Sequence, residues 1–335
     1  MIKTFPYLEI SGTHEEVGAA VGEMFRGIIQ DIIEKRQKTI KNYSTHLDTS
    51  HKYFLETEKV FPKLIKELEG TARGADVPVA DLFFHNNPEV YDQTLEWDRE
   101  QAQVDHCTIA VSKNAKGAII GHNEDWSIDS LDELFILKAT IDDTTFLTLN
   151  YASFIAGSSA SINNWGLVQC INELHQVSQI GVAKYFTARA ILDCKTLEEV
   201  ETMITSIKRA SGYNHVLVQG DDLWDIETAA HDIDIEKKSV GAYVHTNHCL
   251  SEKMKKHHIS VSQSSKERYK RANEMIKDNM TKEDMITLLS DQTNTAFPIS
   301  RENVTIGSVI IEPSQFLMHI CHGAPHSGEY VTYEL

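Results

Sequence analysis

The residues with the clearest capacity for chemistry are a cysteine and an aspartate that a hairpin should bring together. Cys107 stands in the segment 105–108 (DHCT), and Asp125 follows eighteen residues later in the segment 121–126 (GHNEDW). The chain between them has the pattern of two short strands around a turn at 114–116, and a hairpin returns its ends to one place. We therefore expect Cys107 and Asp125 to be neighbours. A nucleophilic thiol is one interpretation, and a buried structural cysteine beside a solvated carboxylate is the alternative.

The composition argues against nucleic-acid and membrane-surface partners. The chain has 335 residues, of which 32 are Lys or Arg and 49 are Asp or Glu, so its net charge is −17. A broad nucleic-acid surface needs a basic face, and an anionic membrane attracts basic segments. No stretch approaches the roughly 18 apolar residues of a membrane span, and the first residues lack an apolar signal region. We expect a cytoplasmic protein with no nucleic-acid or membrane partner.

Common cofactor and metal motifs are absent from the sequence. It contains no GxxxxGK[ST], GxGxxG, GxSxG or HExxH pattern, and its five cysteines are far apart. The sixteen histidines leave a metal site as an alternative, with candidate ligands at His245, His248, His319, Cys321, His322 and His326. Residues three apart in a strand face opposite sides, so His245 and His248 should not share an ion. We expect neither a metal nor another cofactor.

Helical blocks and serial hairpins alternate along the chain. A capping box at Thr13 and Glu16 begins a helix whose apolar face continues to Ile33, and a second helical run from Phe61 is expected to end at Gly70. Hairpin-like strand pairs fill 107–172, helices return at 183–209 and 265–290, and strands are expected at 214–220, 223–230, 241–247 and after 305. The length allows two domains or one large unit. Blocks of helices and antiparallel strands without βαβ alternation predict an α+β layered fold.

Several of these segments together resemble a known family. They are DHCTIAV (105–111), GHNEDW (121–126), the spacing from Gly166 to Asn172, and HTNHCL (245–250), with a similar upstream stretch at 68–90. In this order they resemble the acyl-CoA:6-aminopenicillanate (isopenicillin-N) acyltransferase family of N-terminal-nucleophile (Ntn) hydrolases. A more distant likeness is to choloylglycine hydrolases and penicillin V acylases. The resemblance runs from about residue 10 to about residue 312.

The resemblance implies a four-layer αββα sandwich, in which two stacked antiparallel sheets are flanked by helices. It also implies that the chain is a precursor that cuts itself between His106 and Cys107. The mainly helical fragment 1–106 and the nucleophile-bearing fragment 107–335 would then stay associated as one structural unit. Residue 106 is His in this sequence, where the best-known members have Gly. A bulky residue there could slow the cut, or its imidazole could assist it.

The resemblance also implies catalytic roles by position. Cys107 is the nucleophile, Asp125 holds and orients the α-ammonium that cleavage frees, and Asn247 stabilises the tetrahedral oxyanion. Arg301 matches a late catalytic arginine, with a salt bridge at a loop edge as the alternative.

Two further positions are expected to bind substrate. Asn172 matches an asparagine near the oxyanion or the substrate. His122 either faces the substrate or is hydrogen-bonded at the end of the sheet.

The implied chemistry agrees with elementary acid–base behaviour. A cysteine thiol has a pKa of about 8.5, and a freed α-amine has a pKa of roughly 7.7–8.0, so one N-terminal residue can supply nucleophile and base. The implied substrate is a small-molecule amide or acyl-thioester. Water or an amine could open the acyl-enzyme, so hydrolase and acyltransferase both stay open, and homo-oligomer formation is allowed. The alternatives are an unprocessed, non-catalytic binding protein and a histidine-rich metal-binding protein.

Overall fold

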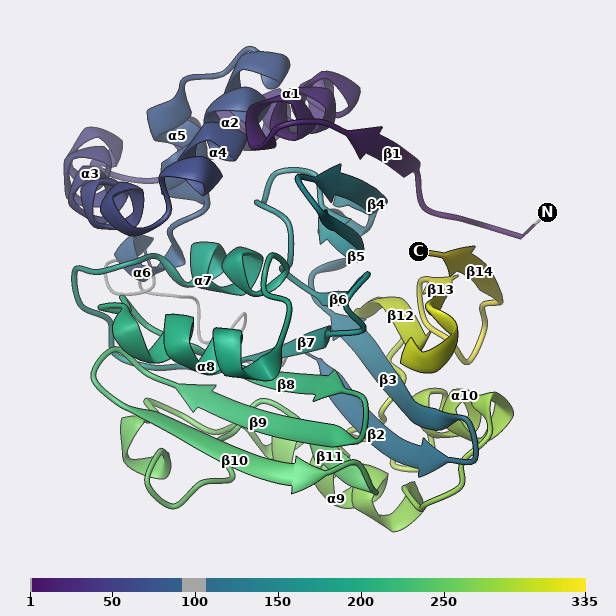
Figure 1. Ribbon diagram of the computed structural model, residues 1–335. Coiled ribbons are helices and arrows are strands. Elements are labelled where there is room, and N and C mark those ends of the chain that lie inside the picture. Colours follow the sequence, from purple (N-terminus) through teal and green to yellow (C-terminus); the bar gives the residue numbers. More distant parts are fainter. Residues whose placement is uncertain (1, 92–106) are drawn as a thin grey trace.

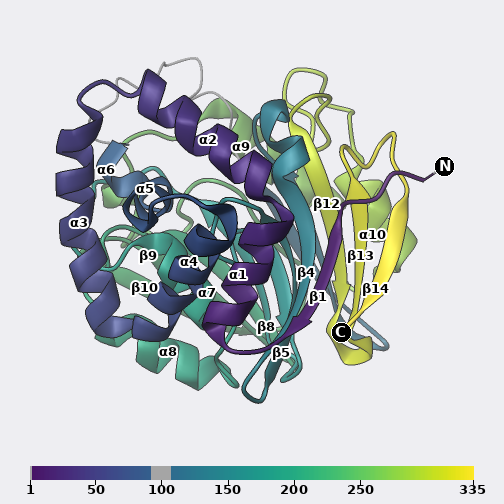
Figure 2. The ribbon, with the colours of Figure 1, turned by 90° about the horizontal axis from the view of Figure 1, so that it is seen from above.

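Two β-sheets stack face to face and carry helices on both outer surfaces. The structure, a computed structural model, describes residues 2–91 and 107–335. The view from above shows the four layers in order, from α1–α4 through the sheet with β4 and the sheet with β12 to α10 (Figure 2). This arrangement confirms the predicted α+β fold of αββα type.

The first sheet has eight strands in the order β1-β4-β5-β6-β7-β8-β9-β10 (Figure 1). Its strands are β1 (Tyr7–Ser11), β4 (Leu134–Ile141), β5 (Thr144–Tyr151), β6 (Ala160–Asn163), β7 (Val168–Glu173), β8 (Tyr213–Gln219), β9 (Asp222–Thr228) and β10 (Ile233–Ser239). All neighbours are antiparallel except β1 and β4, which run parallel. The sequence analysis anticipated neither edge strand, β1 nor β10.

The second sheet has six antiparallel strands in the order β11-β2-β3-β12-β13-β14. They are β2 (Thr108–Asn114), β3 (Gly117–Asp125), β11 (Tyr243–His245), β12 (Thr305–Glu312), β13 (Leu317–His322) and β14 (Tyr330–Glu334). The expected hairpin of 107–123 is therefore present as β2 and β3, at the centre of this sheet.

Helices cover the outer face of each sheet. The first sheet carries α1 (His14–Met24), α2 (Arg26–Thr39), α3 (Tyr43–Val60), α4 (Pro62–Ala75), α5 (Val79–His85), α6 (Pro88–Tyr91), α7 (Lys184–Ile191) and α8 (Leu197–Ser206). The second carries α9 (Gln263–Met275) and α10 (Lys282–Leu289). Short 3-10 turns lie at Ile128–Glu133, Lys255–His257 and Pro313–Gln315.

Alternating side chains along the strands build three apolar layers. In β4, Leu134 and Ile136 pack between the two sheets, whereas Phe135 and Leu137 pack under the N-terminal helices. Successive strand residues point to opposite faces, so a nearly continuous apolar run such as LFILKATI indicates a strand buried on both faces. The layer between the sheets is therefore filled by side chains from both.

Glycines join α1 and α4 at unusually short range. A Cβ atom on Gly70 would lie 2.2 Å from the carbonyl oxygen of Glu15, and one on Gly18 would lie 1.9 Å from that of Glu67. The expectation that the helix ends at Gly70 is therefore wrong. The helix α4 continues to Ala75, because Gly70 serves close backbone packing rather than termination.

The first helix of the sequence analysis is also interrupted. Its capping box is present, since the backbone N–H of Glu16 donates to Thr13 and the Glu16 carboxylate accepts from the backbone N–H of Thr13. The helical run breaks at Phe25, so that α1 and α2 are separate. The apolar spacing continued through the break because both helices pack on the same sheet.

We expect Gly70→Ala to lower the free energy of unfolding by about 1–3 kcal/mol, because the new methyl group has no room against α1. Urea unfolding monitored by circular dichroism measures this change. Gly27→Ala in α2 is the matched control, since nothing lies within 4 Å of a Cβ atom there. That variant should be neutral or up to about 1 kcal/mol more stable, because alanine favours helix. Equal losses in both variants would contradict the packing argument.

Candidate active site

Cys107 is held at the entrance of β2 in a strained conformation. Its φ of +50° lies in the left-handed region, which costs a residue with a side chain about 1–3 kcal/mol. Thr108 pairs with Asn123 in the β2–β3 register, so Cys107 lies across from Glu124 and beside Asp125. The expected neighbourhood of Cys107 and Asp125 is therefore present. His106, the other residue of the expected cleavage site, lies outside the described residues.

The carbonyl oxygen of Cys107 accepts two hydrogen bonds from buried side chains. Asn172 on β7 donates through Nδ2 at 3.1 Å, and Arg268 on α9 donates through Nη1 at 2.8 Å. The two donors come from the opposite sheet and from an outer helix. Three layers thus fix the position of the nucleophile's backbone.

Arg268 was missed by the sequence analysis. Besides Cys107, its guanidinium donates to Thr108 Oγ1 at 2.7 Å, to Asn247 Oδ1 at 2.9 Å and to Ser264 Oγ at 3.2 Å. The side chain is fully buried, on the same face of α9 as Ser264 and Ala272. An arginine at helical spacing within a face of small residues was the available signal, because such a position is normally apolar.

The hydrogen-bond partners of Asn247 determine which way its side-chain amide is oriented. Arginine can only donate, so the oxygen of Asn247 must face Arg268. The nitrogen then donates to the carbonyl oxygen of Glu173 at 3.2 Å, at the edge of the pocket. The amide nitrogen that could bind an oxyanion is thus directed to the end of β7.

Asp125 and Arg301 form a buried ion pair. Arg301 Nη2 lies 2.9 Å from Asp125 Oδ2, and the Thr305 hydroxyl donates to the other oxygen of the fully buried carboxylate. The structure therefore brings together these two residues of the expected catalytic set. The ion pair fixes the Asp125 carboxylate at the end of β3, next to Cys107.

Glu124 is a second pocket residue that the sequence analysis missed. Alternation along β3 sends Asn123 toward α10, where it donates to Leu289 and Ile299, and sends Glu124 between the sheets. The Glu124 carboxylate accepts from Tyr151 Oη at 2.8 Å and from the Ser159 hydroxyl. The period of two in GHNEDW was the available signal, because Glu124 and Asp125 cannot face the same side.

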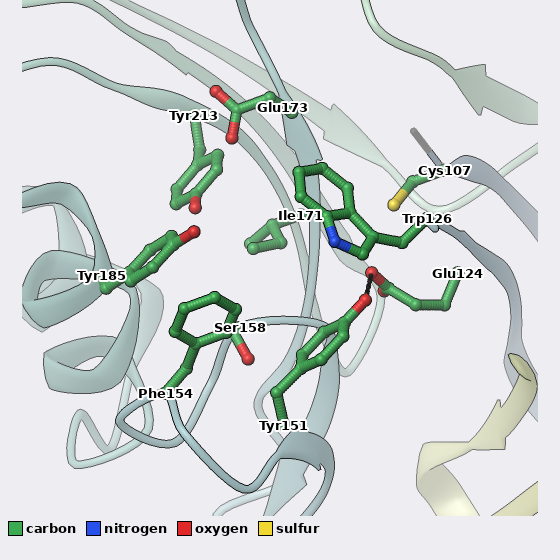
Figure 3. Close-up of a pocket in the computed structure, with 10 residues that line it drawn as sticks. All are labelled: Cys107, Glu124, Trp126, Tyr151, Phe154, Ser158, Ile171, Glu173, Tyr185 and Tyr213. Carbon is green, nitrogen blue, oxygen red and sulfur yellow. Dashed lines mark hydrogen bonds between the residues drawn. The ribbon is translucent and has the colours of Figure 1, made fainter. Parts of the chain in front are cut away.

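The pocket beside Cys107 is rich in aromatic rings (Figure 3). It is lined by Cys107, Glu124, Trp126, Tyr151, Phe154, Ser158, Ile171, Glu173, Tyr185 and Tyr213. Four of the rings form a continuous series, which we call the aromatic wall: Tyr151, Phe154, Tyr185 and Tyr213. Neighbouring ring centroids along it are 5.4, 4.8 and 6.0 Å apart. The wall runs from Glu124 to Glu173.

His122 occupies one of its two expected settings. It is fully buried, and its Nε2 lies 2.9 Å from Glu124 Oε2. The residues that line the pocket in the described part of the chain do not include it. The structure thus places His122 in a hydrogen bond at the end of the sheet, behind Glu124.

Within residues 2–91 and 107–335, two groups of side chains have the composition of metal ligands. They are Cys107, His122 and Glu124 in one group, and Asp225, Glu227 and His245 in the other. His245 also binds Asn172 Oδ1 through Nδ1 at 2.9 Å. His248 instead contacts Ser265, at 2.8 Å. His245 and His248 therefore contact different side chains.

Burial raises the pKa of the Cys107 thiol well above its usual range. The carboxylates of Glu124 and Asp125 act in the same direction, while the backbone N–H of Asp125 and the charge of Arg268 oppose them. In the continuous chain the thiol therefore holds its proton at neutral pH. An added base is required before this sulfur can act as a nucleophile.

The family model described as acyl-coenzyme A:6-aminopenicillanic acid acyl-transferase matches residues 112–327, which is more than half of the chain. The protein belongs to this family. The match includes Asp125, Asn172, Asn247 and Arg301 and begins five residues after Cys107.

Two individual proteins are also similar. β-Alanyl-dopamine/carcinine hydrolase of Drosophila melanogaster is 26% identical over 214 residues, which cover 58% of this chain and 55% of that protein. The chain thus spans about half the length of this relative. A crystal structure of a conjugated bile acid hydrolase variant from Clostridium perfringens has a TM-score of 0.46 at 9% identity, covering 68% of this chain and 97% of the other. Among the helices of residues 2–91 and 107–335, none has the length and apolar character to cross a membrane.

We expect the rate of alkylation of Cys107 in uncut chains to keep rising with pH up to about pH 10. A raised thiol pKa moves formation of the thiolate to higher pH. An ordinary thiol with a pKa of about 8.5 levels off earlier. Iodoacetamide labelling followed by peptide mass spectrometry measures the rate at this site. The same peptide in urea-unfolded chains is the control and should level off near the ordinary value. Identical pH profiles in the two states would contradict the raised pKa.

We expect Arg268→Lys to lower the free energy of unfolding by about 2 kcal/mol or more, because a lysine cannot supply the forked donors and leaves buried oxygens without partners. Arg271→Lys on the same helix is the matched control. Arg271 is partly exposed and pairs with Asp291 and Glu274, so its loss should be about 1 kcal/mol or less. Urea unfolding compares the two variants, and similar losses would show that the buried fork contributes little.

Proposed function

We propose that this protein is a self-cleaving cysteine Ntn enzyme that breaks the amide bond of a small molecule through an acyl-thioester on Cys107. The observation that carries the proposal is the position of the Cys107 sulfur. It lines the aromatic pocket at the start of β2, directly beside the ion pair of Asp125 and Arg301.

Self-cleavage is the first step of the proposal. A neighbouring base takes the Cys107 thiol proton, the sulfur attacks the carbonyl carbon of His106, the peptide C–N bond breaks, and the base returns the proton to the nitrogen. A thioester then joins residue 106 to the sulfur, and water opens it to give a free carboxyl group and a free thiol. The new α-amine belongs to Cys107 itself, and Asp125 at the end of β3 is the neighbouring carboxylate that would hold its protonated form.

The same sulfur then acts on the substrate. The α-amine accepts the thiol proton, and the thiolate attacks the amide carbon. The tetrahedral intermediate breaks its C–N bond, and the leaving amine takes the proton from the α-ammonium. Water or a second amine then attacks the thioester, releasing the acyl group and restoring the thiol. Water gives hydrolysis, and an amine gives acyl transfer.

Asn247 and Asn172 support these steps from two sides. The Asn247 amide nitrogen, directed to the end of β7 by Arg268, would donate to the oxyanion. Such a positioned donor is worth about 2.7–4 kcal/mol in a transition state. Asn172 acts on the nucleophile instead, because its amide nitrogen holds the carbonyl oxygen of Cys107.

The two fragments of the proposal, 1–106 and 107–335, would stay together after cleavage. The strand β1 is hydrogen-bonded to β4 from Tyr7 to Ser11. Phe25 packs on Phe135 with ring centroids 4.5 Å apart, within the apolar layer that the N-terminal helices share with the first sheet. Cutting one peptide bond removes none of these contacts.

An amide substrate is further supported by the similarity to the Drosophila protein, whose name describes a hydrolase of β-alanyl-dopamine and carcinine. A pocket lined mainly by aromatic and apolar side chains with a few polar groups is typical of small-molecule sites. Cys107, Asp125 and Asn247 are all present in one neighbourhood, which favours catalysis over a purely binding role.

Intact-mass spectrometry tests both parts of this proposal. We expect the wild type to separate into fragments 1–106 and 107–335, because the free α-amine is required for turnover. After incubation with a panel of acyl amides and thioesters, an acyl group should be found on the Cys107 fragment. Adding an amine acceptor and analysing the products distinguishes acyl transfer from hydrolysis.

Cys107→Ala should stay whole, take up no acyl group and be inactive. Cys194→Ala is the matched control, since this thiol lies between α7 and α8, away from the pocket, and the variant should behave as the wild type. A wild type that stays whole would show that the processing step is wrong. Amide hydrolysis by Cys107→Ala at the wild-type rate would show that the nucleophile is wrong.

A further inference from the structure

Four carboxylates face one another on β9 and β10, the last two strands of the first sheet (Figure 1). The register of this pair places Asp225 opposite Glu236 and Glu227 opposite Asp234. Residues directly opposite each other in an antiparallel pair lie on the same face, and like charges there repel each other. A positive group between these side chains would remove that repulsion.

Two of these carboxylates are buried, since the exposed fractions of Asp225 and Glu227 are 4% and 1%. Within the described part of the chain, their ion pairs include a single partner, His245, which is charged only when protonated. Backbone N–H groups of the loop after β11 donate hydrogen bonds to Glu227, but these groups carry no net charge. Buried charges are normally paired or bound to a metal ion. We therefore expect a cation beside Asp225 and Glu227.

A pocket gives cations access to this cluster. Its lining includes five carboxylates, those of Asp225, Glu227, Asp234, Glu236 and Glu252. Glu236 and Glu252 are exposed, so the pocket reaches the solvent. Such a concentration of one charge attracts ions of the opposite sign.

The hydrogen bonds of Asn172 determine which nitrogen of His245 carries a hydrogen. The Asn172 amide nitrogen donates to the carbonyl oxygen of Cys107, so its amide oxygen must accept from His245 Nδ1 at 2.9 Å. In a neutral imidazole the other nitrogen, Nε2, is then an acceptor. This nitrogen lies 3.4 Å from Glu227 Oε1, which is also an acceptor. Two acceptors at this distance require a cation, which is either a proton on Nε2 or a metal ion.

Asn214 on β8 offers a buried oxygen to the same cation. Its side chain is fully buried and its amide nitrogen donates to Asp225, while its amide oxygen has no hydrogen-bond partner among the described residues. Asn214 pairs with Glu227 in the register of β8 and β9, so the two side chains share a face. A buried polar group without a partner costs about 1–3 kcal/mol. A bound metal ion would supply the missing partner, because amide oxygens are metal ligands.

The distances between the candidate ligand atoms are close to those around a bound ion. One oxygen each of Asp225 and Glu227 and one nitrogen of His245 lie within 4.8 Å of one another. An ion bonded at roughly 2.0–2.2 Å to each ligand holds the ligand atoms no more than about 4.4 Å apart. Only small side-chain movements would therefore close the three ligands on an ion.

From these observations we propose that Asp225, Glu227 and His245 bind one divalent metal ion, of the kind represented by Zn²⁺ and Mn²⁺. Two carboxylates and an imidazole form a donor set that these ions accept. The proposal differs from the sequence-based expectation of no metal, because the ligands that meet His245 lie on β9 of the other sheet. It does not depend on the proposed function.

Two hydrogen bonds would link the ion to the nucleophile. With Nε2 bound to the metal, His245 Nδ1 keeps its hydrogen and donates to Asn172, which holds the carbonyl oxygen of Cys107. Metal-bound histidines commonly have their second ring nitrogen held in this way. The ion would thus help to position Cys107 from outside the pocket that Cys107 lines.

Titration of the full-length Cys107→Ala variant with Zn²⁺ after treatment with a chelator tests the proposal. This background is used because Cys107 belongs to the other group of candidate ligands, with His122 and Glu124. Isothermal titration calorimetry should show one Zn²⁺ per chain, and Mn²⁺ should compete for the same site.

Two further substitutions in this background assign the ion to its ligands. Asp225→Asn and Glu227→Gln keep the shape of each side chain and remove its charge, so each should weaken Zn²⁺ binding by at least about tenfold. Glu252→Gln is the matched control, since this carboxylate lines the same pocket but is exposed and pairs with Lys255. That variant should change the affinity less than threefold.

Thermal unfolding gives a second measurement that needs no fitted affinity. An ion that binds only the folded chain raises the Tm. Saturating Zn²⁺ should therefore raise the Tm of the Cys107→Ala protein and leave that of the Asp225→Asn double variant unchanged. Without metal, the double variant should be at least as stable as its parent, because one of the opposed carboxylates has lost its charge.

Two outcomes would overturn the inference. If the Cys107→Ala protein binds neither Zn²⁺ nor Mn²⁺, a proton on His245 Nε2 fills the gap to Glu227 and there is no metal site. If binding and the rise in Tm are the same with Asp225→Asn and Glu227→Gln, the ion lies at other histidines of the chain.

Discussion

The carbonyl oxygen of Cys107 is the point at which the layers of this fold are tied together. The residue itself enters the six-stranded sheet, Asn172 reaches it from the eight-stranded sheet, and Arg268 reaches it from an outer helix. Each donor is in turn held by others, Asn172 by His245 and Arg268 by its contacts with Thr108 and Asn247. Because the main chain of the nucleophile is fixed in three directions, its sulfur can be fixed too, even though its backbone is strained.

Two adjacent carboxylates on β3 show how one strand can serve two tasks. Asp125 is neutralised by Arg301 on one side, and Glu124 faces the space between the sheets on the other. Only the pleat of the strand separates them. Burial is the main cause of the raised pKa of the Cys107 thiol, and the charges of these two carboxylates raise it further.

The parts of the site that depend on a local sequence pattern could be predicted from the sequence. The hairpin spacing placed Cys107 beside Asp125, and the alternating runs gave most of the strands. Motifs such as HTNHCL predicted the family membership that the match over 112–327 confirms.

Long-range pairing could not be predicted from local motifs. The strand β1 pairs with β4 more than a hundred residues away, and Gly70 is explained only by the backbone of α1. Arg268 was missed for the same reason, since its partners Cys107, Thr108 and Asn247 come from two distant segments.

The pairing of β1 with β4 sets an order of events for this molecule. A chain that began at residue 107 would expose β4 as an open edge, with its apolar Phe135 face bare to water. Such edges invite association with other chains. The N-terminal part covers the edge of β4 and the Phe135 face. We therefore expect any cut near the nucleophile to come after this part has folded onto the sheet. If the two parts were produced as separate polypeptides, β1 of one chain would have to pair with β4 of the other.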